Sequence, residues 1–212
     1  MSIRIVPAVL TDDPVELAKM LQYAVNYTDF VQIDIMDGQF VPSRSITWQD
    51  IQRVLPRPGW EVHLMVKSPE NELANYQQAG ALKAIFHYEA TSQPGVVISV
   101  ARKLGIKIGM AINPDTPVSA VLPLVEKLDS LLFMSVYPGY YGAKYIPEVL
   151  DKVRELNRLK PDFCLSIDGG INQNNLMEVA ASGVNEICVG SGIFRQADPA
   201  EAYRNLYKLV NQ

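Results

Sequence analysis

The sequence lacks long hydrophobic runs and contains few cysteines. Its apolar segments, such as IRIVPAVL at residues 3–10, are much shorter than the roughly 18 residues that a membrane span needs. No basic leader with a cleavage site precedes them, so we expect a soluble, cytoplasmic protein without a targeting segment. Cys164 and Cys188 each lie in a short apolar segment, and we expect buried thiols rather than a disulfide or a nucleophile.

The sequence also lacks an excess of basic charge. Its 19 lysines and arginines are scattered along the chain and are outnumbered by 23 acidic residues, which gives a net charge of −4. This pattern argues against nucleic acid or an anionic membrane as a partner, and any anion must be bound locally. With 13 glycines and 14 prolines among 212 residues and 48% hydrophobic residues, the composition excludes collagen-like and disordered chains and is typical of a globular protein.

Eight short apolar segments rich in β-branched residues recur at nearly even spacing, and each is followed by helical sequence. The predicted strands are 3–9, 30–35, 60–66, 82–88, 106–112, 131–136, 163–168 and 186–190. Strands that alternate with helices pair in parallel, because a short hairpin cannot join parallel neighbours.

Prolines and glycines punctuate these units. Five prolines are predicted to open helices: Pro14, Pro69, Pro117, Pro147 and Pro199. Three glycines are predicted to close helices: Gly80, Gly105 and Gly183. Eight units of about 26 residues, without a linker, predict an α/β fold in which residues 1–212 form a single-domain (β/α)₈ TIM barrel.

Polar side chains are expected at the ends of three predicted strands. The alternation of a strand places Gln32 and Asp34 on the inward face of 30–35, His63 on that of 60–66 and Asp168 on that of 163–168. A buried carboxylate costs several kcal/mol unless it is paired, and no lysine or arginine ends these strands. The set predicts a zinc, manganese, iron or cobalt site, with the Gln32 amide oxygen as a further candidate ligand. The alternative is a hydrogen-bonded core histidine and two loop-capping aspartates.

Glycines follow the last two predicted strands. Gly169 and Gly170 end one, and Gly190 with Ser191 ends the other. Loops at these places commonly bind phosphate in such barrels through backbone N–H groups, although glycines also simply allow tight turns.

A tyrosine-rich loop, MSVYPGYYGAKY, follows the sixth predicted strand. Gly139 and Gly142 could act as hinges for a lid over a bound substrate, or the loop could be a surface or subunit contact. Met36, Met65 and Met134 end strands and could line a water-poor site or simply fill the core.

With these features in view, the whole chain resembles the ribulose-phosphate 3-epimerase family. The matching segments are PAVL (7–10), IDIMDGQFVP (33–42), EVHLMV (61–66), FHYEA (86–90), NPDTP (113–117), MSVYPG (134–139), IDGGI (167–171) and VGSGIF (189–194).

The resemblance implies an isomerase of the pentose phosphate pathway that converts D-ribulose 5-phosphate to D-xylulose 5-phosphate. It implies that Asp34 and Asp168 exchange one proton on opposite faces of the sugar, and that both ligate a divalent metal together with His63. It further implies a homo-oligomer. The substrate and phosphate contacts that it assigns are Met36, Met65, Met134, Gly139, Gly142, Gly169, Gly170, Gly190 and Ser191.

The sequence departs from the family at three places. Gln32 replaces the histidine that is the fourth metal ligand, and an amide oxygen binds zinc more weakly than imidazole. Ala8 replaces a serine that holds substrate hydroxyls. The family loop NPGFGGQ is YPGYYGA, which places Tyr137, Tyr141 and Ala143 at altered positions.

Three functions therefore remain open. The first is a ribulose 5-phosphate epimerase with weakened metal binding or a different preferred metal. The second is an epimerase or isomerase of another ketose phosphate, with weak or no metal dependence. The third is a sugar-phosphate-binding barrel without turnover.

Overall fold

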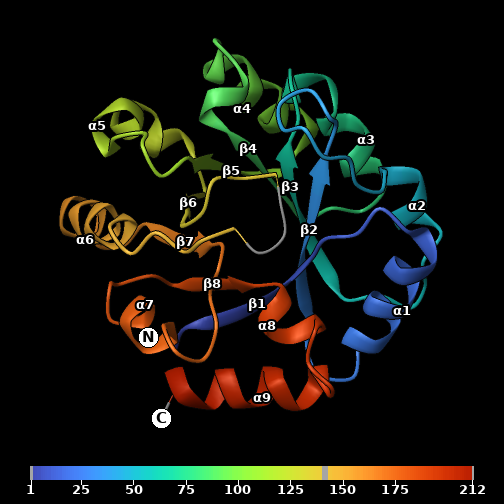
Figure 1. Ribbon diagram of the computed structural model, residues 1–212. Coiled ribbons are helices and arrows are strands. Elements are labelled where there is room, and N and C mark those ends of the chain that lie inside the picture. The colour runs from blue at the N-terminus through green and yellow to red at the C-terminus, as the bar shows by residue number, and fades with distance from the viewer. Residues whose placement is uncertain (1, 140–142, 212) are drawn as a thin grey trace.

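The computed structural model describes residues 2–139 and 143–211, and its centre is a closed barrel of parallel strands (Figure 1). The strands pair in chain order, and β1 pairs with β8 to close the ring. They are β1 (Arg4–Val9), β2 (Phe30–Met36), β3 (Gly59–Met65), β4 (Lys83–His87), β5 (Lys107–Ile112), β6 (Ser130–Met134), β7 (Cys164–Asp168) and β8 (Glu186–Val189). The predicted (β/α)₈ fold is confirmed.

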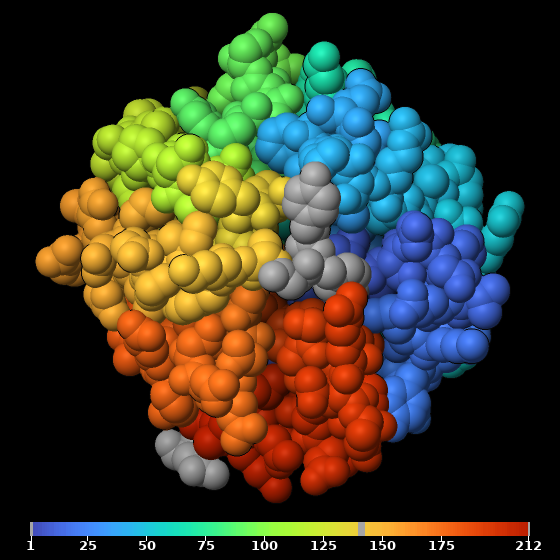
Figure 2. Space-filling view, in the orientation of Figure 1, coloured from blue at the N-terminus to red at the C-terminus, as the bar shows by residue number. Residues whose placement is uncertain are grey.

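Helices surround the barrel, and successive units follow one another around its axis (Figures 1 and 2). The helices are α1 (Pro14–Ala24), α2 (Trp48–Gln52), α3 (Leu73–Gln78), α4 (Pro94–Leu104), α5 (Val118–Val121), α6 (Val149–Leu159), α7 (Leu176–Ala180), α8 (Ser191–Phe194) and α9 (Pro199–Val210). Short 3₁₀ segments are η1 (Pro69–Asn71), η2 (Tyr88–Ala90) and η3 (Leu122–Lys127). No helix within the described ranges is long and apolar enough to cross a bilayer.

The helix punctuation is confirmed for most of the predicted residues. Pro14 and Pro199 open α1 and α9 behind the capping side chains of Asp13 and Asp198, while Pro69 opens the 3₁₀ segment η1. Two predicted starts are wrong. Pro117 is the N-cap residue before α5 and has an extended backbone, and Pro147 lies in a turn two residues before α6.

The glycines predicted to close helices have left-handed backbones. Gly80, Gly105 and Gly183 have φ of 96°, 69° and 99° and follow α3, α4 and α7. A side chain is disfavoured in this region of the Ramachandran plot, so these positions favour glycine.

Strand alternation separates two layers of core. The outward side chains of β2, such as Val31 and Ile33, are buried against the helix layer. A second apolar cluster, including Val6, Ile85 and Leu132, fills the barrel. At the N-terminal end of the strands the barrel holds an ion cluster, in which Lys83 Nζ lies 2.6 Å from Glu61 Oε2 and 3.2 Å from Glu186 Oε2. Glu61 therefore belongs to the barrel floor and not to the opposite end.

A substitution at Gly183 tests the left-handed backbone conformation at the end of α7. A Cβ at Gly183 would lie 2.2 Å from Asn157 Nδ2, in a backbone conformation that L-residues avoid. We expect Gly183→Ala to lower the free energy of unfolding by about 1–3 kcal/mol, measured by chemical denaturation. A Cβ at Gly95 in α4 would meet no atom within 4 Å, so the control Gly95→Ala is expected to raise the free energy of unfolding by about 0.5–1 kcal/mol. Equal effects of the two variants on the free energy of unfolding would contradict a left-handed, crowded backbone at Gly183.

Candidate active site

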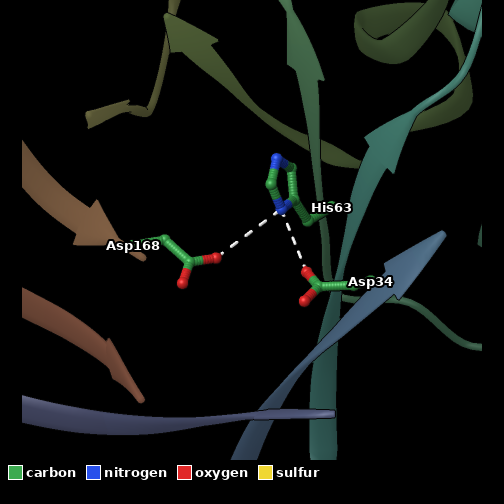
Figure 3. Close-up of side chains that lie close together, drawn as sticks. All are labelled: Asp34, His63 and Asp168. Carbon is green, nitrogen blue, oxygen red and sulfur yellow. Dashed lines mark hydrogen bonds and ion pairs between the residues drawn. The ribbon is translucent and has the colours of Figure 1, made fainter. Parts of the chain in front are cut away.

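Three strand ends bring Asp34, His63 and Asp168 together inside the mouth of the barrel (Figure 3). Asp34 and His63 are register partners on β2 and β3, whereas Asp168 approaches from β7 on the other side. His63 Nδ1 lies 3.0 Å from Asp34 Oδ1 and 3.7 Å from Asp168 Oδ2. Asp34 and Asp168 are 7% and 8% exposed, and His63 is fully buried. The convergence predicted from strand alternation is present.

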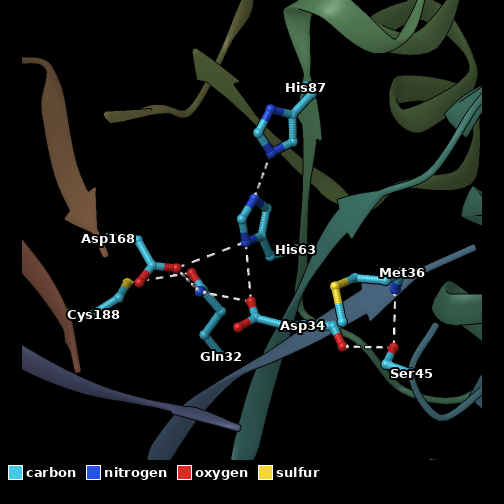
Figure 4. Close-up of polar contacts among 8 residues, drawn as sticks. All are labelled: Gln32, Asp34, Met36, Ser45, His63, His87, Asp168 and Cys188. Atoms are coloured by element: carbon cyan, nitrogen blue, oxygen red, sulfur yellow. Dashed lines mark hydrogen bonds and ion pairs between the residues drawn. The ribbon is translucent and has the colours of Figure 1, made fainter. Parts of the chain in front are cut away.

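Gln32 links the two acids directly (Figure 4). Its Nε2 donates hydrogen bonds to Asp34 Oδ1 at 3.0 Å and to Asp168 Oδ2 at 2.6 Å. The thiol of Cys188 on β8 donates to Gln32 Oε1 at 3.2 Å, which favours this orientation of the amide. An amide and an imidazole thus accompany the carboxylates, and no lysine or arginine is among the described residues that line the site.

The donor set fits a divalent metal at three of the four predicted positions. One ligand atom from each of Asp34, His63 and Asp168 lies within 4.8 Å of the other two. Nitrogen and carboxylate oxygen are suitable ligands for zinc, manganese, iron or cobalt. Gln32 presents its amide nitrogen, which carries two hydrogens and cannot ligate a metal. Gln32 as a fourth ligand stays a prediction that requires its amide to turn over.

Burial and proximity shift the proton affinities of this cluster. Burial, followed by the nearby charge of Asp34, raises the pKa of Asp168 to about 7. Burial works to lower the pKa of His63, but the hydrogen bond and the charge of Asp34 outweigh it and raise that pKa. A carboxyl group that titrates near neutrality is suited to both accepting and donating a proton.

The predicted binding residues line one cavity around these groups. Those lining it are Met36, Met65, Met134, Gly139, Gly169, Gly170, Gly190 and Ser191, together with Ala8 and Ala143. Gly142, Tyr140 and Tyr141 lie outside the described residues. Tyr137 is 55% exposed and is not among the described lining residues.

The paired glycines after β7 allow a close approach of backbone segments. Gly169 has φ of 117°, and a Cβ there would lie 2.5 Å from Val136 Cγ2. Gly170 has φ of 65° and a Cβ would lie 3.2 Å from Tyr145 Cα. Packing and backbone conformation alone disfavour other residues at these two positions, so the tight-turn interpretation also applies to them.

Four residues of the site were not predicted from the sequence. Ser45 donates to the carbonyl of Asp34 at 3.0 Å and accepts from the N–H of Met36 at 2.9 Å, which fixes the end of β2. Cys188 contacts Gln32, and His87 with Glu89 continues the cluster behind His63. The FHYEA segment was a visible signal for the last two, but the contact of His87 with His63 depends on the register of β3 and β4.

Comparison with known proteins decides the family. The model of the ribulose-phosphate 3-epimerase family matches residues 4–194. The chain belongs to this family. The ribulose-phosphate 3-epimerase of Mycobacterium tuberculosis H37Rv is 36% identical over 204 residues, covering 93% of this chain and 89% of that protein. The enzyme of the same name from Schizosaccharomyces pombe is 35% identical over 213 residues, covering 98% and 93%. The epimerase-type enzyme class predicted from the sequence is therefore confirmed.

Solved structures of lower sequence identity share the fold. 3-Hexulose-6-phosphate synthase from Salmonella typhimurium has a TM-score of 0.74 at 17% identity, with 98% of each chain covered. 3-Keto-L-gulonate-6-phosphate decarboxylase from Vibrio cholerae has a TM-score of 0.73 at 14% identity, with 99% of each chain covered. At these identities the likeness concerns the barrel alone.

Gln32 provides a test of metal binding at this site. Replacing the amide by imidazole removes the hydrogen-bond bridge and adds a stronger nitrogen ligand. We expect Gln32→His to raise the metal content after dialysis to about one ion per chain, measured by elemental analysis. Gln78→His, on the exposed surface of α3, is the matched control and should leave the metal content unchanged. Equal metal content in wild type and Gln32→His would argue against a four-ligand metal site here.

Proposed function

We propose that the protein interconverts D-ribulose 5-phosphate and D-xylulose 5-phosphate by moving a proton at carbon 3. The observation that carries this proposal is the pair of carboxylates, Asp34 and Asp168, that enter one cavity from opposite sides of the barrel mouth. The family and the names of its members support the substrate.

Inversion at a carbon next to a ketone needs a base on one face and an acid on the other. Asp34 removes or returns the proton on one face, and Asp168 does the same on the other. Negative charge develops on the substrate oxygens between them, where Gln32 and His63 hold the two carboxylates in place. Asp34, His63 and Asp168 would hold a divalent metal, which would supply positive charge to stabilise the negative charge that develops.

Other lining residues fit a sugar phosphate. The backbone N–H groups near Gly169, Gly170, Gly190 and Ser191 are suited to a phosphate without a basic side chain, which agrees with the acidic net charge. Met36, Met65 and Met134 give the cavity an apolar wall that keeps water from the reacting carbon.

Ala8 favours a second candidate, an epimerase of a different ketose phosphate. Its methyl group lines the cavity and cannot hydrogen-bond a substrate hydroxyl.

The lysine chemistry of Schiff-base aldolases or of orotidine-phosphate-type decarboxylases is less suitable, because the segments LLFMSV and IDIMDG contain no lysine. A cytoplasmic homo-oligomer of the pentose phosphate pathway stays a prediction from the family resemblance.

The test is a coupled epimerase assay on D-ribulose 5-phosphate, with and without chelator and added divalent metals. Asp34→Asn and Asp168→Asn should each lower kcat by at least about 100-fold, because each amide can no longer move the proton on its face. Asp162→Asn, on the exposed surface, is the matched control and should retain wild-type kcat.

Turnover retained in either active-site variant would contradict the two-aspartate assignment. Wild-type turnover of another ketose phosphate but not of D-ribulose 5-phosphate would favour the second candidate. A wild-type protein that binds sugar phosphates without turnover would favour a binding protein.

A further inference from the structure

The only two histidines of the chain face one another behind the candidate active site (Figure 4). His63 Nε2 lies 2.9 Å from His87 Nε2, and the ring centroids are 5.0 Å apart with an interplanar angle of 21°. Both side chains are fully buried. If both nitrogens carried a proton, the two protons would clash. If neither did, two lone pairs would face one another. One nitrogen therefore donates a hydrogen bond and the other accepts it.

The carboxylate of Glu89 faces the other ring nitrogen of His87. Glu89 Oε2 lies 3.5 Å from His87 Nδ1, a distance of an ion-pair contact rather than of a strong hydrogen bond. His87 Nδ1 forms no hydrogen bond with any described residue, so the Glu89 carboxylate is the charged group that faces it. Because a carboxylate accepts and cannot donate, it favours the proton of a neutral His87 on Nδ1. His87 Nε2 is then the acceptor, and His63 Nε2 is the donor.

The carboxylate of Glu89 is held in a fixed orientation by the turn after β5. The backbone N–H of Asn113 donates to Glu89 Oε1 at 2.9 Å, and the hydroxyl of Thr116 donates to the same oxygen. Lys152 on α6 donates to the carbonyls of Asn113 at 3.0 Å and of Thr116 at 2.8 Å. One carboxylate oxygen is therefore occupied by fixed donors, and the other is directed to His87.

We propose that Glu89 and His87 are positioning residues that keep a ring proton of His63 on Nε2, so that His63 Nδ1 can offer its lone pair toward Asp34 and Asp168. His63 Nδ1 lies 3.0 Å from an oxygen of Asp34. A nitrogen lone pair and a carboxylate at that distance require a proton or a cation between them. With the ring proton of His63 on Nε2, the position next to His63 Nδ1 suits a metal ion. This inference rests on the proposed function for the use of the site, whereas the proton positions are a property of the protein alone.

Glu89→Gln should reverse the direction of these hydrogen bonds. The Asn113 N–H is a fixed donor, so the amide oxygen of the new side chain must take the place of Glu89 Oε1. The amide nitrogen then faces His87 Nδ1, which must accept, and the His87 proton moves to Nε2. His63 Nε2 becomes the acceptor and its proton moves to Nδ1, where it blocks the metal-facing lone pair.

The experiment is NMR of protein labelled with ¹⁵N in histidine, without substrate, in metal-free and Zn²⁺-loaded form. Two histidines give only four ring nitrogens to assign. We expect His87 Nε2 to be the unprotonated nitrogen of its ring in both forms of the wild type, and His87 Nδ1 to be the unprotonated one in Glu89→Gln. Thr116→Val removes one donor to Glu89 but keeps the carboxylate, so it is the matched control and should retain the wild-type pattern.

A second measurement is Zn²⁺ affinity by calorimetry with the metal alone. Glu89→Gln should weaken Zn²⁺ binding about 10- to 100-fold, and Thr116→Val should change it little. An unprotonated His87 Nδ1 in the wild type would overturn the proposal even if Glu89→Gln does not fold. An unchanged ring pattern in folded Glu89→Gln would overturn it as well. Absence of epimerase turnover would instead contradict the proposed function and leave the proton positions unaffected.

Discussion

Two buried carboxylates, with ligand oxygens within 4.8 Å of one another and no lysine or arginine among the described residues that line the site, set the main constraint on this protein. Their mutual repulsion and their loss of hydration have to be balanced by neighbouring dipoles or by a cation. Gln32 donates to both, and His63 contacts both. These contacts come from the interior of the barrel, so the electrostatics of the site depend on the closure of the whole sheet.

The register of the barrel strands places the groups that contact the two carboxylates. Pairing of β2 with β3 sets His63 directly beside Asp34, and pairing of β7 with β8 sets Cys188 beside Asp168. A shift of one residue in either pair would move a polar side chain into the apolar layer beneath the helices. The same strand ends lead into the glycine loops at the cavity, so one register positions both the acids and the residues suited to phosphate.

Much of the fold and part of the site could be predicted from the sequence. Eight apolar strand segments and their alternation were enough to place Asp34, His63 and Asp168 at one end of a barrel. The direction of the Gln32 amide could not be predicted, because it depends on Asp168 and Cys188, which are 136 and 156 positions away. The contacts of His87 and Glu89 also depend on packing between separate units. Pro117 and Pro147 mislead because an extended residue precedes α5 and a turn precedes α6.

Running the reaction in D₂O tests whether Asp34 and Asp168 act on opposite faces of one carbon, as proposed. With two acids, the proton removed on one face stays with one carboxylate while the other carboxylate delivers hydrogen from solvent. We expect newly formed product to carry one deuterium at carbon 3 from the first turnovers, while unreacted substrate keeps its original hydrogen. Product that retains the hydrogen of the substrate at carbon 3 would contradict the assignment of two acids to opposite faces.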